Sequence, residues 1–389
     1  MNLIPLSLIS RRWFEALSQL ECGTLHFVSP GGEEHVFRGP QPGPEARFSI
    51  RDWDVLRHAA ARGDIGLGED YINGAWKTDS IEALFSLFLI NLERVDGFAH
   101  GSLFNRLAFV ILDSFVRRNS VSGSKANIKA HYDVGNEFYR LWLDETMTYS
   151  SALYSRADMG LADAQREKYG RIIERFGTEP TSVLEIGCGW GGFAESAANA
   201  GHDVTAITVS PAQHAYATER LQGKADIRLE DYRHTSGTFD RIASIEMLEA
   251  VGERYWPQYF NTIAQRLKSS GTALIQTITI GDEIFSQYRT RSDFVRHYVF
   301  PGGTLPSPGR IREEAERAGL RVVDAFSFGQ DYARTLREWS EGLTTKEEEI
   351  RALGYDNYFL RNWKFYLGIC AAAFAVRRTD VVQFQLEHA

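Results

Sequence analysis

The spacing of apolar residues divides the chain into two parts, and the second part alternates between strands and helices. Apolar runs of strand length cover residues 182–186, 204–209, 225–229, 241–245 and 272–277. Helical periodicity lies between these runs, at residues 193–200, 213–221 and 255–267. Strands that alternate with helices of about 10–15 residues predict an α/β fold, in which a mostly parallel sheet carries helices on both faces. Ligands of such sheets bind at the carboxyl ends of the strands.

The first part of the chain follows a different pattern. Strand-like runs cover residues 24–28 and 35–38, and helical periodicity begins at Asp52. These elements predict a small α+β domain whose function the sequence does not reveal. An apolar helix is expected over residues 103–116.

A polar stretch marks the clearest boundary in the chain. The sequence NSVSGSKAN at residues 119–127 has the composition of a linker. We therefore expect a small N-terminal domain over residues 1–118, the linker over 119–127, and a catalytic domain over 128–389.

Composition limits the class of protein. The chain has 389 residues, of which 43% are hydrophobic, and a net charge of −8. It is long enough for two or three domains of about 100–200 residues each and too apolar for a disordered protein. The three cysteines lie far apart, which argues against a disulfide framework and against a zinc site, and which favours a cytoplasmic setting. No run reaches the ~18 apolar residues of a membrane-spanning helix. The negative charge gives no general reason to bind nucleic acid.

The strongest local signal is a glycine-rich turn after the strand at 182–186. The sequence LEIGCGWGG at residues 184–192 places an acid near the strand end and then four glycines before a helix. Glycines at such a turn permit positive φ and close approach of a ligand, which suits a dinucleotide or S-adenosylmethionine. A nicotinamide site would favour an acid ~20 residues further on. Thr208, Ser210 and Gln213 are found there instead, so the sulfonium cofactor is the favoured ligand.

Acidic residues follow two more predicted strands. The segment 230–233 (EDYR) offers a carboxylate for an adenine amino group and an aromatic ring for stacking. The segment 246–249 (EMLE) brings two carboxylates to the same edge of the sheet.

Seven motifs along the chain together resemble one enzyme family. They are HYDVGN at 131–136, MTYS at 147–150, LEIGCGWGG at 184–192, ITVS at 207–210, DYR at 231–233, EAVG at 249–252 and YVFPGG at 298–303. The set resembles the cyclopropane-fatty-acyl-phospholipid synthases, relatives of the mycolic-acid cyclopropane synthases. The resemblance implies a Rossmann-like class I methyltransferase domain with a seven-stranded sheet.

The resemblance also implies an activity and a cofactor site. The family transfers a methyl group from S-adenosylmethionine to a cis double bond of a phospholipid acyl chain, and loss of a proton then closes a cyclopropane ring. The residues that would hold S-adenosylmethionine are Tyr132, Tyr149, Ser150, Glu185, Gly187, Gly189, Gly191, Thr208, Ser210, Gln213, Asp231 and Tyr232.

In the family, a bound bicarbonate is thought to take the proton. Its expected neighbours in this chain are Glu249, Tyr332 and the backbone of Ile278. Two further positions depart from the family, because Ser151 replaces a cysteine and Gln276 replaces a histidine. Both side chains can donate hydrogen bonds to an anion, but neither titrates near neutral pH. We expect methyl transfer to survive and a cyclopropane ring to form. A methyl- or methylene-branched acyl chain is the alternative product.

Other functions stay open at this point. A small-amine N-methyltransferase shares much of the scaffold, and a non-catalytic lipid- or cofactor-binding paralogue would explain the two departures. For the lipid enzyme, the resemblance implies peripheral association with the inner face of the membrane and leaves a homodimer open. Three arginines among aromatic residues, Arg289, Arg291 and Arg296, are candidates for contact with anionic headgroups.

Overall fold

The computed structural model describes residues 6–92 and 134–389, which form two compact units. The first unit holds residues 6–92, 290–299 and 343–378, and the remaining described residues form the second. No single cut in the chain therefore separates the units. The predicted linker at 119–127 and the apolar helix at 103–116 lie outside the described residues. The domain boundaries drawn from the sequence stay a prediction.

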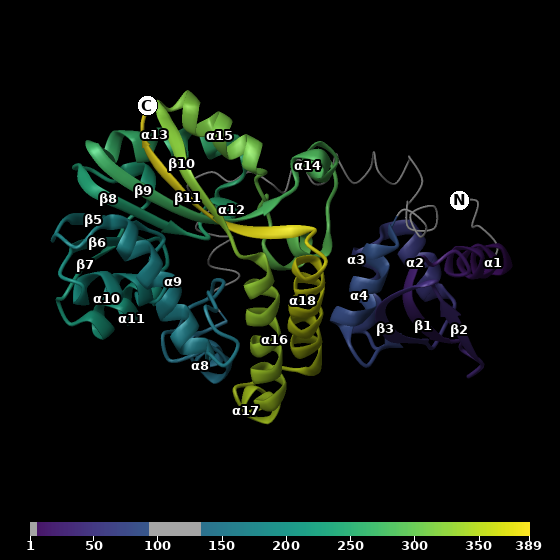
Figure 1. Ribbon diagram of the computed structural model, residues 1–389. Coiled ribbons are helices and arrows are strands. Elements are labelled where there is room, and N and C mark those ends of the chain that lie inside the picture. Colours follow the sequence, from purple (N-terminus) through teal and green to yellow (C-terminus); the bar gives the residue numbers. More distant parts are fainter. Residues whose placement is uncertain (1–5, 93–133) are drawn as a thin grey trace. The chain divides into compact units, whose positions relative to one another are not determined.

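A seven-stranded sheet forms the centre of the second unit (Figure 1). In spatial order its strands are β10 (Leu320–Ser327), β11 (Thr379–His388), β9 (Leu267–Ile280), β8 (Phe239–Ile245), β5 (Ser182–Ile186), β6 (Asp203–Thr208) and β7 (Asp226–Leu229). The last five run parallel, whereas β11 is antiparallel to both of its neighbours. The mostly parallel sheet expected from the sequence is thus confirmed.

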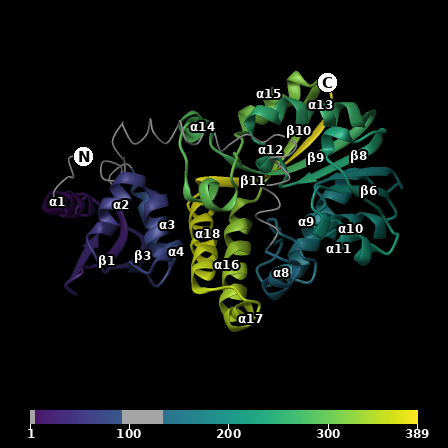
Figure 2. The same cartoon turned by 180° about the vertical axis from the view of Figure 1, so that it is seen from behind.

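Helices cover both faces of this sheet, because alternate strand residues point to opposite faces. Val183 packs with α9 (Leu161–Phe176), α10 (Gly192–Asn199) and α11 (Pro211–Leu221). Its neighbour Leu184 belongs to a second core with α13 (Trp256–Arg266) and α15 (Pro308–Arg317). Figure 2 shows the two groups of helices on opposite sides of the strands. The remaining helices of this unit are α8 (Asn136–Trp142), α12 (Leu248–Val251), α14 (Asp282–Tyr288) and most of α16 (Gly329–Thr345).

The sequence pattern predicted the strands in the middle of the chain more accurately than those near its end. Strand β5 has the predicted bounds, whereas β9 is longer than the predicted 272–277. Strands β10 and β11 were not predicted. Strand β11 pairs with both β9 and β10, so it needs partners that lie far from it in the sequence.

The first unit contains a smaller sheet with the strand order β2-β1-β3-β4. Its strands are β1 (Cys22–Val28), β2 (Glu34–Arg38), β3 (Gln41–Ile50) and β4 (Trp76–Lys77), and its helices are α1 (Leu6–Leu17), α2 (Asp54–Arg62), α3 (Asp64–Ile72), α4 (Ile81–Ile90), α17 (Glu347–Ala352) and α18 (Asn357–Ala375). Helix α18 packs on α3 and α4, where Gly368 leaves room for Ile81. The apolar face of α18 explains why residues late in the chain belong to this unit.

In the part of the chain that the structure describes, no helix is both long and apolar enough to cross a bilayer.

Candidate cofactor and active site

The glycine-rich turn joins the end of β5 to the start of α10. Gly187 and Gly189 have φ values of +84° and +52°, a region that costs other residues conformational energy. A Cβ atom on Gly187 would lie 2.9 Å from Met247 Cγ, so only a glycine fits here without displacement. The turn therefore exposes backbone at the carboxyl end of the sheet.

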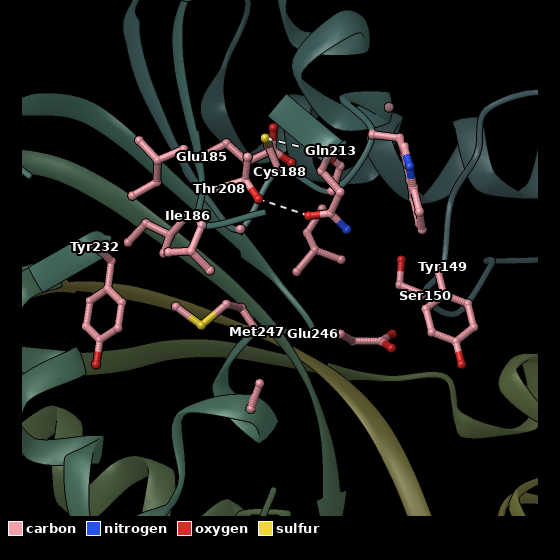
Figure 3. A pocket seen from close by; sticks show the side chains of 18 of the residues that line it. Tyr149, Ser150, Glu185, Ile186, Cys188, Thr208, Gln213, Tyr232, Glu246 and Met247 are labelled. Atoms are coloured by element: carbon pink, nitrogen blue, oxygen red, sulfur yellow. Dashed lines mark hydrogen bonds between the residues drawn. The ribbon is translucent and has the colours of Figure 1, made fainter. Parts of the chain in front are cut away.

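A cavity opens over this turn, and Figure 3 shows many of the side chains that line it. Its volume is about 160 Å³, against the roughly 10–15 Å³ that one water needs, so it can hold a small organic ligand. Its walls come from the ends of β5, β6, β7 and β8 and from the segment that carries Tyr149 and Ser150. The ligand site is thus at the carboxyl ends of the parallel strands, as expected for this kind of sheet.

Glu185 is a buried acid in the wall of the cavity. Burial raises the pKa of Glu185 to about 8. Its Oε2 atom has no hydrogen-bond partner among the described residues. A ligand that brings an ammonium or hydroxyl group would supply the missing donor and would favour the ionised form.

Polar groups at and after the ends of β6 and β7 complete the cavity. Thr208 Oγ1 donates to Gln213 Oε1 over 2.9 Å, which leaves the amide nitrogen of Gln213 to face a ligand (Figure 3). Asp231 is held by two hydrogen bonds from the Arg233 guanidinium. Burial opposes the ionisation of Asp231, but the bonds from Arg233 outweigh it and lower the pKa of this carboxyl. The ring of Tyr232 lies beside it, and burial raises the pKa of its phenol to about 12.

This arrangement fits S-adenosylmethionine. The carboxylates can bind the ammonium group of its amino-acid part, and the polar side chains and the ring of Tyr232 can contact its nucleoside part. Most residues predicted for the cofactor line the cavity: Tyr149, Ser150, Glu185, Gly187, Gly189, Thr208, Gln213, Asp231 and Tyr232. Gly191 and Ser210 instead cap the helices that follow, α10 and α11. Tyr132 lies outside the described residues. The individual roles of these residues stay predictions.

The predicted catalytic residues gather next to the cavity, around two carboxylates. Glu246 accepts hydrogen bonds from the backbone N–H of Ser151 (2.9 Å), Gln276 Nε2 (2.8 Å) and Tyr332 Oη (2.6 Å). Glu249 accepts a hydrogen bond from the backbone N–H of Ile278. The fold thus brings together all five predicted residues, from segments far apart in the sequence.

The hydroxyl of Ser151 does not take part in this cluster. Ser151 Oγ donates to the carbonyl of Ala152 over 3.0 Å, so its backbone N–H is the group that meets the carboxylate. Gln383 on β11 donates to Gln276 Oε1 over 3.0 Å and thereby directs the amide nitrogen of Gln276 toward Glu246. The cluster is a connected network of donors rather than a set of independent contacts.

The two carboxylates differ in their hydrogen-bond partners. Burial, and then the neighbouring Glu246, raise the pKa of Glu249 to about 8. Burial also raises the pKa of Glu246, but Tyr332, Lys168, Ser151 and Gln276 all favour its ionised form. Two adjacent buried carboxyl groups do not both ionise readily. The hydrogen-bond donors and Lys168 therefore favour Glu246 over Glu249 as the ionised member of the pair.

Sequence reasoning missed Glu246 and Lys168 as site residues. The pair of acids at 246–249 had been noted at the edge of the sheet, but the family pattern pointed only to Glu249. Lys168 is completely buried in α9, an amphipathic helix whose pattern gives no sign of a functional lysine. The burial of Lys168 and its neighbours, which only the folded structure shows, are what mark this lysine as part of the site.

Comparisons with known proteins identify relatives of this chain. The sequence profile described as mycolic acid cyclopropane synthetase matches residues 120–384. The chain is 34% identical to tuberculostearic acid methyltransferase UfaA1 of Mycobacterium tuberculosis, over 89% of this chain and 84% of the relative. It is also 34% identical to the cyclopropane-fatty-acyl-phospholipid synthase of Escherichia coli K12, over 87% of each chain.

A solved structure shares its fold with about two thirds of this chain. Mycolic acid cyclopropane synthase CmaA1, complexed with SAH and CTAB, has a TM-score of 0.63 and 31% sequence identity. The match covers 67% of this chain and 97% of that structure.

Proposed function

The chain belongs to the mycolic acid cyclopropane synthetase family, and from this premise we propose that it methylates a cis double bond in the acyl chain of a phospholipid. It is an enzyme of the methyltransferase class, and its methyl donor is S-adenosylmethionine. The observation that carries the proposal is the cavity over the glycine turn, with Glu246 in its wall and the carboxylate cluster behind it.

Bound S-adenosylmethionine would supply an electrophilic methyl group. An alkene is a weak nucleophile, so this chain must exclude water and hold the double bond at attack distance. Methylation leaves a carbocation on the acyl chain, which aromatic faces stabilise by about 2 kcal/mol when desolvated. Tyr149 lines the cavity and stacks on Trp339, with ring centroids 5.1 Å apart, which holds its ring in place.

Ring closure is the product that we propose. It requires loss of a proton from the new methyl group, after which the carbon left with the electron pair bonds to the cationic centre. A methyl- or methylene-branched chain is the second candidate, because one relative is named as a fatty-acid methyltransferase rather than as a cyclopropane synthase. The N-methyltransferase and the non-catalytic paralogue are not favoured by these relatives.

Contact with the membrane surface is part of the proposal. Of the three arginines expected to meet headgroups, Arg296 is only 6% exposed and pairs with Asp293, and Arg289 pairs with Glu253. Arg296 is thus a poor candidate for this role. Co-sedimentation of the protein with anionic vesicles tests the peripheral contact, and light scattering tests the homodimer.

A vesicle assay tests the main proposal. The protein is incubated with S-adenosylmethionine and either dioleoyl phosphatidylglycerol vesicles or ethanolamine, and release of S-adenosylhomocysteine is measured. We expect S-adenosylhomocysteine to be released with the vesicles and not with ethanolamine. Each modified acyl chain should gain the mass of one CH₂ group. Cyclopropane methylene signals in the NMR spectrum of the lipid identify the ring, whereas new olefinic signals identify branching. Release with the amine only would overturn the proposal.

A further inference from the structure

Glu246 stands out because donors from three separate elements converge on its carboxylate. Tyr332 comes from α16, Gln276 from β9 and the N–H of Ser151 from the segment before α9. All three bonds have ordinary lengths, between 2.6 and 2.9 Å. Unlike Glu249, Glu246 also lines the cofactor cavity, and Figure 3 shows its carboxylate directed toward Tyr149 and Ser150. The carboxylate is thus both fixed in position and able to meet a ligand.

The backbone at this position is strained. Glu246 has a φ of +50°, in the left-handed region that a glycine would occupy at no steric cost. A non-glycine residue in this region costs of order 1–3 kcal/mol and persists where the surrounding structure holds it. Here the backbone N–H of Glu246 donates to the carbonyl of Gln276 over 2.8 Å. A glycine would adopt this backbone conformation without strain, but it would have no carboxylate. The glutamate at this position therefore adds a carboxylate to the site at a cost in conformational energy.

The cluster does not fit a bound bicarbonate. The donors expected for such an anion were Tyr332, Gln276, Ser151 and the N–H of Ile278. Tyr332 and Gln276 Nε2 donate to Glu246, as does the backbone N–H of Ser151. The hydroxyl of Ser151 donates to the carbonyl of Ala152, and the N–H of Ile278 donates to Glu249. A further anion would find these donors in use and would lie beside a negative charge, which is unfavourable in a buried site.

We propose that the carboxylate of Glu246 is the catalytic base that removes the proton from the methylated acyl chain, in the place of an external anion. This inference rests on the proposed function, since it needs an acyl carbocation beside the cofactor. Of the two carboxylates, Glu246 is the one that lines the cavity, and its three hydrogen-bond donors favour its ionised form.

The reaction balances without any other reactant. The double bond gives its π pair to the methyl carbon, the carbon–sulfur bond breaks toward sulfur, and a cation remains on the neighbouring acyl carbon. A Glu246 oxygen then takes a proton, and the released carbon–hydrogen pair closes the ring or forms a new double bond. The proton finally returns to solvent. No oxidant or reductant is consumed.

Two other buried groups are poorer candidates for the base. Lys168 Nζ donates to Ser150 Oγ over 2.6 Å, and Lys168 does not line the cavity. Tyr332 donates its phenol proton to Glu246, and burial raises its pKa well above the ordinary value, so the phenolate is not available near neutral pH. Both residues act on Glu246 rather than on the substrate.

The first test is Glu246→Gln, with the exposed Glu219→Gln on α11 as the matched control. Both are assayed with S-adenosylmethionine and dioleoyl phosphatidylglycerol vesicles. Loss of a general base lowers the rate about 10²- to 10⁴-fold. We expect this loss for Glu246→Gln, a shift of the remaining product toward methylated alcohol as water captures the cation, and wild-type behaviour for Glu219→Gln. An unchanged rate and product ratio in folded Glu246→Gln would overturn the inference.

The second test is rescue of Glu246→Gly by an added anion. This change removes the carboxylate and suits the local φ, and it leaves the three donors without their acceptor. We expect the variant to be nearly inactive in carbonate-free buffer. Added bicarbonate or formate should raise its rate about tenfold over the rate without the anion, because a small anion replaces the carboxylate. No rescue in a folded variant would argue against the base role.

The wild type gives a third readout that needs no variant. With a built-in base, its rate in carbonate-free buffer should equal the rate with added bicarbonate. A rate that depends on bicarbonate would refute the inference while leaving the proposed function intact. If the wild type methylates no lipid at all, the proposed function itself fails, so the two failures are distinguishable.

Discussion

Lys168 Nζ donates a hydrogen bond of 2.6 Å to Ser150 Oγ, in a position where the lysine has no exposed surface. Burial lowers the pKa of Lys168 to about 7, and the carboxylates of Glu246, Asp144 and Glu185 act against this effect. The bond connects α9 to the segment that lines the cavity, and the ammonium group favours the negative charge of Glu246. We therefore expect Lys168 to act as a positioning residue for Ser150 and for Glu246.

Replacing Lys168 with methionine should change the pH dependence of the reaction. Without the ammonium group, the pKa of Glu246 rises, and the ionised base appears only at higher pH. We expect the acidic limb of the kcat/KM profile to move to higher pH, together with a lower kcat. The exposed Lys224→Met serves as the control and should keep the wild-type profile. Coincident profiles for Lys168→Met and the wild type would contradict this role.

Tyr332→Phe removes one donor from Glu246 and keeps the aromatic ring. A hydrogen bond to a charged group contributes about 1.5–3 kcal/mol, so turnover should fall roughly 10- to 100-fold. Binding of S-adenosylhomocysteine, measured by calorimetry, should be unchanged, because Tyr332 does not line the cavity. Tyr358→Phe is the control, since that side chain is 52% exposed. Equal loss of binding and turnover would indicate a general disturbance instead.

Gly187→Ala tests the glycine turn. The new methyl group would lie 2.9 Å from Met247 Cγ at a φ of +84°. The left-handed conformation alone costs alanine about 1–2 kcal/mol, and the displaced turn should bind S-adenosylhomocysteine at least about tenfold more weakly. Gly170→Ala, in helix α9 with nothing within 4 Å, is the matched control. It should bind normally and gain up to about 1 kcal/mol of stability.

Glu249→Gln should make stability less dependent on pH. The pKa of Glu249 rises on folding from its ordinary 4.5 to about 8, so between these values the unfolded chain releases a proton that the folded chain keeps. The free energy of unfolding therefore falls as pH rises through this window and levels off above it. The variant lacks this effect, so its melting temperature relative to wild type should increase from pH 5 to pH 8. If the difference in melting temperature between Glu249→Gln and the wild type stays constant from pH 5 to pH 8, Glu249 does not titrate in this way. The exposed Glu219→Gln is the control and should show no such change with pH.

Local signals were enough to predict the glycine turn, the strands around it and the cofactor cavity. The turn at 184–192 and the strand at 182–186 depend on residues next to each other in the chain, where glycine conformation and apolar runs are decisive. The family resemblance then predicted that Glu249, Gln276, Tyr332 and Ser151 share one site. The structure brings these residues together, although their separate roles stay predictions.

The tertiary structure alone decided how these groups are connected. Glu246 meets Ser151, Gln276 and Tyr332 across 95, 30 and 86 residues of sequence, and its own φ of +50° sets where the carboxylate points. Neither the long-range partners nor the backbone angle can be derived from the local pattern EMLE. The sequence by itself therefore predicted S-adenosylmethionine as the methyl donor, because the glycine turn, the residues at 208–213 and the family motifs are all local features of the chain. Only the fold decided which carboxylate receives the donors, because hydrogen bonds between distant segments exist only after the chain has packed.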